Sequence, residues 1–248
     1  MNYFISGRSG FIGTSIQQYL TSKGSFVHGI PRCLSKEELV RYFEKVNPDY
    51  IIHLATYGNH YHQKDFRQMV KTNILETYNL LEAAKTTNYK LFYNVSTSSV
   101  LLKDQTYYSI TKLCGEQLSG MYKNVVNIRP YSVYGPGEGS HRFIPTIIDC
   151  LNSGNEMILD ENATHAWIFI DDFIKAMFAG ETELGGAKTS NIEIVRILEQ
   201  ISGKKLKYIS GKLRSYDTEN WVMPKPICYT SLYNGLKLTY EYFVRNNW

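Results

Sequence analysis

The first half of the chain alternates short apolar runs with longer stretches in which apolar residues recur three and four positions apart. Short apolar runs are typical of buried strands, and the wider spacing is typical of helices that pack by one face. The expected strands cover residues 3–6, 26–30, 50–54, 91–95 and 125–129. The expected helices cover residues 11–23, the stretch between Ser35 and Asn47, residues 66–85 and residues 107–122. Such alternation with short connections predicts a parallel sheet covered by helices on both faces.

The pattern changes after Pro130, where a Gly-Pro-Gly turn follows. Helical spacing is then found in three stretches, residues 143–151, 190–201 and 231–245. We therefore expect an α/β fold whose main part is a doubly wound parallel sheet of the Rossmann type. The expected domains are an NADP-binding domain in residues 1–130, to which residues 165–180 return, and a smaller C-terminal substrate-binding lobe in residues 131–248.

Composition narrows the class of protein. Hydrophobic residues make up 43% and charged residues 20%, as in ordinary soluble proteins. The formal net charge of +4 is too small to indicate a nucleic-acid partner. We expect no signal peptide, membrane span or metal site, and therefore a cytoplasmic protein. The cysteines lack metal-ligand spacing and are expected to be reduced thiols: Cys33, Cys114, Cys150 and Cys228.

Glycines at three-residue intervals mark the junction between the first strand and the first helix. Gly7 would allow a tight turn, Gly10 would let a pyrophosphate approach the backbone, and Gly13 would let the helix pack closely. The helix N-terminus would offer free N–H groups to the phosphates. The predicted phosphate-binding residues are Gly7, Arg8, Ser9, Gly10, Phe11, Ile12 and Gly13.

The end of the second strand indicates which dinucleotide binds. The fold usually carries an acid there for the adenosine ribose, but the sequence reads Gly-Ile-Pro-Arg at residues 29–32. Arg32, with Arg8, could instead pair with a 2′-phosphate. The alternative is that both arginines are solvated on the surface. The pattern favours NADP over NAD.

A Tyr-x-x-x-Lys pair stands at the start of the expected helix 107–122. The spacing places Tyr108 and Lys112 on one helix face. A tyrosine has a pKa near ~10, and a neighbouring ammonium lowers it. Tyr108 could then exchange a proton at neutral pH, and Lys112 could also hold the cofactor ribose.

Hydroxyl side chains follow the strand that precedes this helix, in the run Ser-Thr-Ser-Ser at residues 96–99. In parallel sheets, ligands bind beyond the carboxyl ends of the strands, so one hydroxyl could contact a substrate oxygen. Alternatively, these side chains satisfy only loop backbone groups. The glycine turn, the hydroxyl cluster and the Tyr-x-x-x-Lys pair in this order favour an enzyme.

These motifs resemble the extended short-chain dehydrogenase/reductases, the NAD-dependent epimerase/dehydratase family. Similar stretches are His53-Leu54-Ala55, Asn73 after Lys71-Thr72, the Arg-Pro-Tyr-Ser-Val-Tyr-Gly-Pro-Gly run at 129–137 and the Trp-Ile-Phe-Ile-Asp-Asp strand at 167–172. Within the family the resemblance is strongest to CDP-abequose and CDP-paratose synthases, which reduce a 4-keto-3,6-dideoxyhexose on a nucleotide. It implies a homodimer through helices 66–85 and 107–122.

The resemblance also implies roles for single residues. The implied catalytic residues are Thr97, Tyr108 and Lys112. Beyond the glycine turn, Arg32, Tyr108 and Lys112, the implied cofactor contacts are Leu54, Ala55, Thr56, Asn73, Tyr131 and Val133. The implied substrate contacts are Thr97, Ser98, Ser132, Arg142, Phe143 and His165. Arg142 could instead be a surface ion-pair partner.

Departures from the family pattern bear on the reaction. The family's dehydratases follow the catalytic Thr with Asp-Glu, whereas Ser98 and Ser99 stand here. A diphosphate-binding arginine is replaced by His165, and the stretch between Arg32 and Tyr50 is short. We therefore expect NADPH-dependent reduction of a 4-keto nucleotide deoxysugar for surface polysaccharide. The alternatives are a 4-epimerase with tightly bound NAD and a non-enzymatic NADP sensor.

Overall fold

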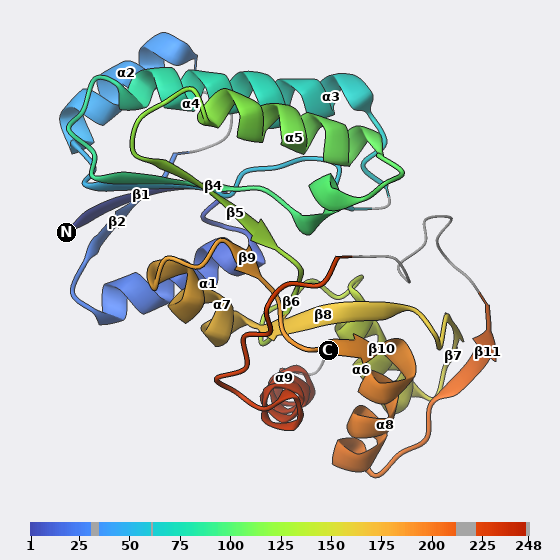
Figure 1. Cartoon of the computed structure of the whole chain (residues 1–248). Coiled ribbons are helices and arrows are strands. Elements are labelled where there is room, and N and C mark those ends of the chain that lie inside the picture. The colour runs from blue at the N-terminus through green and yellow to red at the C-terminus, as the bar shows by residue number, and fades with distance from the viewer. Residues whose placement is uncertain (31–34, 61, 212–221, 247–248) are drawn as a thin grey trace. The chain divides into compact units, whose positions relative to one another are not determined.

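The computed structural model describes residues 1–30, 35–60, 62–211 and 222–246 (Figure 1). The chain forms two compact units, Met1–Pro130 and Tyr131–Trp248. Residues 165–180 fall in the second unit in this division. The part they play toward the first unit stays a prediction.

The first unit contains the predicted parallel sheet, in the strand order β2-β1-β3-β4-β5. Its strands are β1 (Asn2–Ser6), β2 (Phe26–His28), β3 (Tyr50–His53), β4 (Leu91–Val95) and β5 (Val125–Pro130). Its helices include α1 (Phe11–Ser22), α2 (Lys36–Val46), α3 (Phe66–Val70), α4 (Glu76–Ala84) and α5 (Tyr107–Ser119). Figure 1 shows α1 on one face of the sheet and α2 to α5 on the other, which confirms the Rossmann-like fold.

Large apolar side chains of the strands fix α2 and α4 to the sheet. Phe4, Ile51 and Phe92 are fully buried and pack against Phe43 of α2 and Leu81 of α4. Each such side chain contributes about 1.5–3 kcal/mol by leaving water. The sheet is therefore a rigid base for the loops at its carboxyl edge.

The ends of α2 agree with the sequence prediction. The Ser35 side chain accepts from the Glu38 N–H at 3.2 Å, and the Glu38 carboxylate accepts from the Ser35 N–H at 2.7 Å. This reciprocal pair satisfies N–H groups that the helix leaves open. At the other end Asn47 has a left-handed backbone, with φ of 43°, and stops the helix.

The predicted single helix over residues 66–85 is wrong in its centre. A π-helical segment, η1 (Lys71–Leu75), separates α3 from α4. The extra residue per turn leaves Asn73 buried with its side chain bonded to the backbone of Tyr57. Hydrophobic spacing does not indicate this segment, whose polar Asn73 side chain bonds a loop rather than a neighbouring turn of the helix. Such segments occur frequently at functional sites.

The second unit holds a three-stranded sheet in the order β10-β8-β6. The three helices predicted in this unit are confirmed as α6, α8 and α9, whereas α7 was not predicted, and among the strands only β8 overlaps a predicted one. The helices are α6 (Phe143–Ser153), α7 (Ile170–Phe178), α8 (Asn191–Ser202) and α9 (Leu232–Arg245). The strands are β6 (Ser132–Tyr134), β7 (Glu156–Leu159), β8 (Thr164–Phe169), β9 (Glu183–Leu184), β10 (Lys188–Ser190) and β11 (Lys207–Ser210).

The predicted strand over residues 167–172 ends earlier than expected. β8 stops at Phe169 and α7 starts at Ile170, so Asp171 and Asp172 lie in the first turn of the helix. Acidic side chains are favourable there because they face the positive end of the helix dipole. None of the helices in the described segments is long and apolar enough to cross a bilayer.

Candidate active site

The glycine turn joins β1 to α1 as predicted. Gly7 has a positive φ of 71°, and a Cβ on it would lie 2.9 Å from the Ala55 nitrogen. A Cβ on Gly13 would meet the Gly7 carbonyl oxygen. A Cβ on Gly10 would have only that oxygen near it, at 3.4 Å. The turn is therefore tightly packed at Gly7 and Gly13 and open at Gly10.

No side chain caps the start of α1, where Gly10 is the N-cap residue. The first N–H groups of a helix have no partner within the helix, and the helix dipole makes this end positive. Arg8 and Ser9 are exposed, while Phe11 and Ile12 are half-buried. An open glycine at an uncapped helix start fits a dinucleotide pyrophosphate.

Arg8 reaches the end of β2. A Cβ on Gly29 would lie 3.1 Å from both Cδ and Nε of Arg8, so the arginine side chain covers this glycine. No acid occurs among residues 26–30. A guanidinium group thus stands where the fold usually places a ribose-binding carboxylate. Arg32, the other predicted 2′-phosphate contact, lies outside the described residues.

The Tyr-x-x-x-Lys pair lies in the first turns of α5. Thr106 caps this helix, with its hydroxyl accepting from the Ser109 N–H at 3.2 Å. Tyr108 is half-buried, and Lys112 is only 4% exposed. The Lys112 ammonium donates to the Val95 carbonyl at 2.8 Å, which fixes it at the carboxyl end of β4.

Burial lowers the pKa of Lys112 to about 8, and the Glu116 carboxylate opposes this shift. Glu116 is one helical turn further along α5 and forms a bidentate pair with Arg129, with distances of 3.1 Å to Nε and 2.8 Å to Nη2. The Lys112 ammonium therefore sits in a low-dielectric site with a carboxylate within electrostatic reach.

Thr97 follows β4 and begins a short 3-10 helix, Ser98–Leu101. Its hydroxyl accepts from the Ser99 N–H and donates to the Ser99 hydroxyl, each at 3.2 Å. Thr97 is half-buried, whereas Ser98 is 2% exposed. The structure thus brings Thr97 and the Lys112 ammonium to the same strand end.

The predicted cofactor contacts after β3 are tied to this region by hydrogen bonds. The N–H groups of Leu54 and Ala55 donate to the Ser6 hydroxyl at 3.1 and 3.2 Å. The Thr56 hydroxyl donates to the Asn73 side chain at 3.0 Å. Sequence reasoning had missed Ser6, whose place directly before Gly7 was the available signal.

The predicted substrate contacts of the second unit meet at Trp167. Phe143 stacks on its ring with centroids 5.6 Å apart, and His165 lies 5.1 Å away at a tilt of 59°. Arg142 is the residue before α6. Trp167 was not predicted as a site residue, although its position two after His165 places both side chains on one face of β8.

The other residues predicted from this unit lie on or beside β6. Ser132 and Val133 pair in register with Trp167 and Ile168 of β8. The Tyr131 hydroxyl donates to the Val222 carbonyl at 2.8 Å. Their predicted contacts with cofactor and substrate stay predictions.

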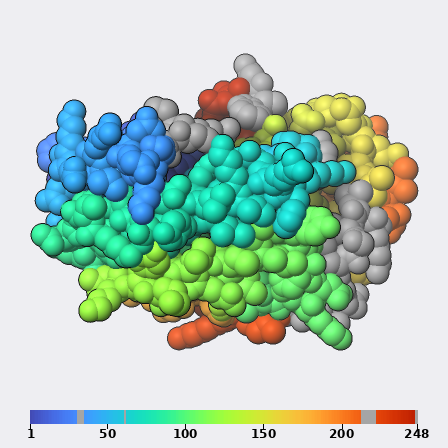
Figure 2. Space-filling model, turned by 90° about the horizontal axis from the view of Figure 1, so that it is seen from above, coloured from blue at the N-terminus to red at the C-terminus, as the bar shows by residue number. Residues whose placement is uncertain are grey.

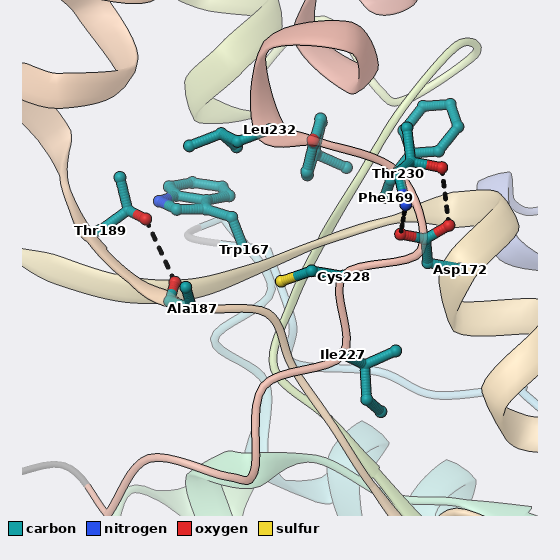
Figure 3. A pocket seen from close by; sticks show the side chains of 10 residues that line it. Trp167, Phe169, Asp172, Ala187, Thr189, Ile227, Cys228, Thr230 and Leu232 are labelled. Carbon is teal, nitrogen blue, oxygen red and sulfur yellow. Dashed lines mark hydrogen bonds between the residues drawn. The ribbon is translucent and has the colours of Figure 1, made fainter.

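A small pocket in the second unit contains none of the predicted site residues (Figure 3). Tyr134, Trp167 and Phe169 form aromatic walls. The Asp172 carboxylate accepts from the N–H and hydroxyl of Thr230, both at 2.8 Å, and the Thr189 hydroxyl donates to the Ala187 carbonyl at 3.1 Å. Because these polar groups bond one another, we assign no ligand here. The described residues also contain no cluster of side chains that could hold a metal ion.

Comparison with known proteins places the chain among nucleotide-sugar enzymes. The model of the NAD dependent epimerase/dehydratase family matches residues 3–192. A CDP-abequose synthase of Salmonella typhimurium is 30% identical over 202 residues, which make up 69% of this chain and 67% of that protein. The uncharacterized UDP-glucose epimerase YtcB of Bacillus subtilis is 28% identical over 212 residues, which make up 70% of this chain and 65% of the relative. The chain thus spans about two thirds of the length of these relatives.

Solved structures share the fold. The UDP-glucuronic acid 4-epimerase of Bacillus cereus, in complex with UDP-glucuronic acid and NAD, superposes with a TM-score of 0.83. It is 24% identical, and the alignment covers 99% of this chain and 100% of that chain. At this identity the likeness shows the fold alone.

Proposed function

We propose, on the premise that this chain belongs to the NAD dependent epimerase/dehydratase family, that it reduces the 4-keto group of a nucleotide-diphosphate-linked deoxysugar with NADPH. The product would serve the synthesis of surface polysaccharide. The observation that carries the proposal is the placement of Thr97 and the Lys112 ammonium at the end of β4, with Tyr108 one helical turn before Lys112.

The chain's own residues supply the proton and the positioning. A nicotinamide dinucleotide held by the glycine turn would supply a hydride, which carries the two electrons that reduce the sugar carbonyl. Tyr108 donates its phenolic proton to the carbonyl oxygen, and the Thr97 hydroxyl donates a hydrogen bond to the same oxygen. Lys112 stabilises the resulting phenolate by its charge. The carbonyl carbon thereby gains a hydride, which carries two electrons, and the oxygen gains the proton of Tyr108, so the ketone becomes an alcohol.

Dehydration is disfavoured by the residues that follow Thr97. Removing water from a nucleotide hexose needs an acid and a base beside the sugar, and Ser98 and Ser99 offer only hydroxyls. We expect no 4-keto-6-deoxy product from any intact nucleotide hexose, as measured by chromatography after long incubation. Turnover of a CDP-linked 4-keto-3,6-dideoxyhexose by the same preparation is the control. Appearance of the 4-keto-6-deoxy product would contradict this reaction class.

A 4-epimerase that retains NAD is the second candidate, because the structurally similar Bacillus cereus enzyme is an epimerase seen with NAD. An epimerase returns its electrons to the sugar, so it shows no net cofactor consumption. A panel of 4-keto nucleotide sugars with NADPH, run beside the matching 4-hydroxy nucleotide sugars without added cofactor, therefore separates the two candidates. Stoichiometric loss of NADPH with a 4-keto sugar supports the reductase, whereas inversion at C4 of a 4-hydroxy sugar supports the epimerase.

The preference for NADPH over NADH tests whether Arg8 contacts the 2′-phosphate of the cofactor. A charge-assisted contact with the 2′-phosphate is worth about 1.5–3 kcal/mol, so NADPH should bind at least about ten-fold more tightly than NADH. Arg8→Ala should remove most of this difference, and Arg32→Ala should narrow it. Dissociation constants of both dinucleotides give the result. Arg41→Ala, on the exposed side of α2, should change neither constant. Equal binding by the unmodified protein would refute the NADP preference.

The helices on one face of the first unit support a homodimer. Large apolar side chains there are between 38% and 63% exposed: Phe66, Leu75, Tyr78, Tyr107 and Ile110. Figure 2 shows this face, with the teal helices α3 and α4 beside the green α5. The Phe66 and Tyr107 rings lie 4.7 Å apart and join the two helices into one surface. Several large apolar side chains exposed on one face are typical of a protein interface.

Oligomeric state should respond to charge on this face. Leu75→Glu should halve the mass measured by light scattering, because a carboxylate buried without a partner opposes association. Leu238→Glu on α9 is the matched control, since Leu238 is 48% exposed and Leu75 is 52% exposed. A dimer that survives Leu75→Glu and Ile110→Glu together would place the interface elsewhere.

A further inference from the structure

A continuous chain of buried and partly buried hydrogen bonds connects the glycine turn to the catalytic helix. It begins at Ser6, whose hydroxyl oxygen accepts from the N–H groups of Leu54 and Ala55. The hydroxyl proton is then free for His53, whose Nδ1 lies 2.6 Å away. Ser6 therefore donates to His53, and Nδ1 carries no proton.

The direction of the next bonds follows from Thr77. Its hydroxyl donates to the Asn73 carbonyl at 2.9 Å, so it can only accept from His53 Nε2, also at 2.9 Å. His53 is 1% exposed, and burial, aided by the positive charge of Lys112, lowers its pKa to about 3. The ring is thus a neutral Nε2–H tautomer over the whole working pH range.

Asn73 continues the connection toward Tyr108. Its side-chain oxygen accepts from the Thr56 hydroxyl and the Tyr57 N–H, and its amide donates to the Tyr57 carbonyl and the Thr111 hydroxyl. The Thr111 hydroxyl in turn donates to the Tyr108 carbonyl at 3.0 Å. All four hydrogen-bonding positions of the Asn73 amide are used, so its orientation is fixed.

Close packing holds the two ends of this chain of bonds in place. A Cβ on Gly115 of α5 would lie 2.9 Å from the Asn73 carbonyl oxygen. A Cβ on Gly7 would lie 2.9 Å from the Ala55 nitrogen. Both contacts bring backbone against backbone with no side chain between them, so the two ends of this chain of bonds are closely packed.

We propose that His53 is a positioning residue with two separable duties, one for each ring nitrogen. Nδ1 holds Ser6, and through it the Leu54–Ala55 backbone against the cofactor turn. Nε2 holds Thr77, and through it Asn73, Thr111 and the first turn of α5 that carries Tyr108. Only the role of Nε2 rests on the proposed function, because only this part of the chain of bonds leads to Tyr108, the proposed proton donor.

Variants of His53 that keep one bond each can separate the duties. In His53→Asn the side-chain oxygen can replace Nδ1 as the acceptor for Ser6, but the side chain is too short for Thr77. In His53→Gln the amide nitrogen can replace Nε2 as the donor to Thr77, while Ser6 loses its acceptor. Loss of one buried hydrogen bond leaves a polar group without its partner, so the affected quantity should change by about ten-fold.

Two measurements read the duties without any sugar substrate. His53→Asn should keep the NADPH dissociation constant and speed amide exchange about ten-fold in peptides covering residues 107–115. His53→Gln should weaken NADPH about ten-fold and leave that exchange unchanged. Thr77→Val, which removes the hydroxyl at nearly constant shape, should reproduce the result of His53→Asn even where a His53 variant does not fold.

The matched control is Phe92→Leu, because the Phe92 ring lies 6.4 Å from His53 and makes no bond in the chain. Phe92→Leu should lower the thermal midpoint. It should leave both the NADPH dissociation constant and the amide exchange of residues 107–115 unchanged. Parallel changes of both quantities in His53→Asn and His53→Gln would overturn the proposal and leave His53 a purely structural residue. Failure of the protein to reduce any 4-keto nucleotide sugar would refute the proposed function and leave these two measurements standing.

Discussion

Tyr108→Phe should cut turnover of a 4-keto nucleotide deoxysugar by ~10²–10⁴-fold, the usual effect of losing one general acid. The substitution removes one hydroxyl and leaves the helix and the glycine turn unchanged, so NADPH affinity should stay within about two-fold. Lys112→Ala should lower turnover as well and also weaken NADPH, because we assign Lys112 a contact with the cofactor ribose. Turnover and dissociation constants of both variants test these expectations.

The two side chains act as a unit in this proposal, so their losses should not add. The double variant should be scarcely slower than the slower single variant. Near-normal activity in Lys112→Ala would reduce the Tyr-x-x-x-Lys pair to a chance match on a helix. Additive losses would keep both residues important and refute the electrostatic coupling.

The pH profile offers an independent readout of the same pair. Burial lowers the pKa of Lys112 to about 8, so the ammonium is present below that pH and is lost as the pH rises through it. Reduction should therefore decline on this alkaline limb. Lys112→Arg keeps its charge at all these pH values and should remove the part of this limb that comes from Lys112, which moves the decline to higher pH.

The regular part of the fold follows from local signals that the sequence displays. Apolar runs give the strands, and Ser35 and Asn47 mark the ends of α2 because capping is a contact between near neighbours. The short strands of the second unit escape this reasoning, since β9 has two residues and β10 has three. Their pairing is decided by partners far along the chain.

The candidate site also has a part that the sequence predicts and a part that it does not. The glycine turn and the Tyr-x-x-x-Lys pair are readable because each depends on spacing within one element. The connection from Ser6 through His53 and Thr77 is not readable, because it joins three elements by side-chain hydrogen bonds. The π-helical segment around Asn73 is hidden for the same reason. Hydrogen bonds between residues far apart in the sequence thus determine the parts of the site that the hydrophobic pattern does not predict.

Gly13→Ala should weaken NADPH binding by about ten-fold or more and also lower the thermal midpoint. The new methyl group would meet the Gly7 carbonyl oxygen and lie 2.8 Å from the Arg8 Cα, and both are backbone atoms that cannot rotate away. Overpacking of this kind costs about 1–3 kcal/mol. The start of α1 would move from the turn, and its N–H groups would no longer point at the pyrophosphate.

Two other glycines separate the packing effect from the binding effect. Gly10→Ala should weaken NADPH with little change in the thermal midpoint, because its methyl group has only the Gly7 oxygen near it, at 3.4 Å, and projects into the open side of the turn. Gly24→Ala should lower the thermal midpoint and leave NADPH affinity unchanged. Its φ of 75° strains any residue with a side chain, and no other group lies within 4 Å. Normal NADPH affinity in Gly13→Ala, measured beside these two variants, would mean that the turn between β1 and α1 does not hold the cofactor.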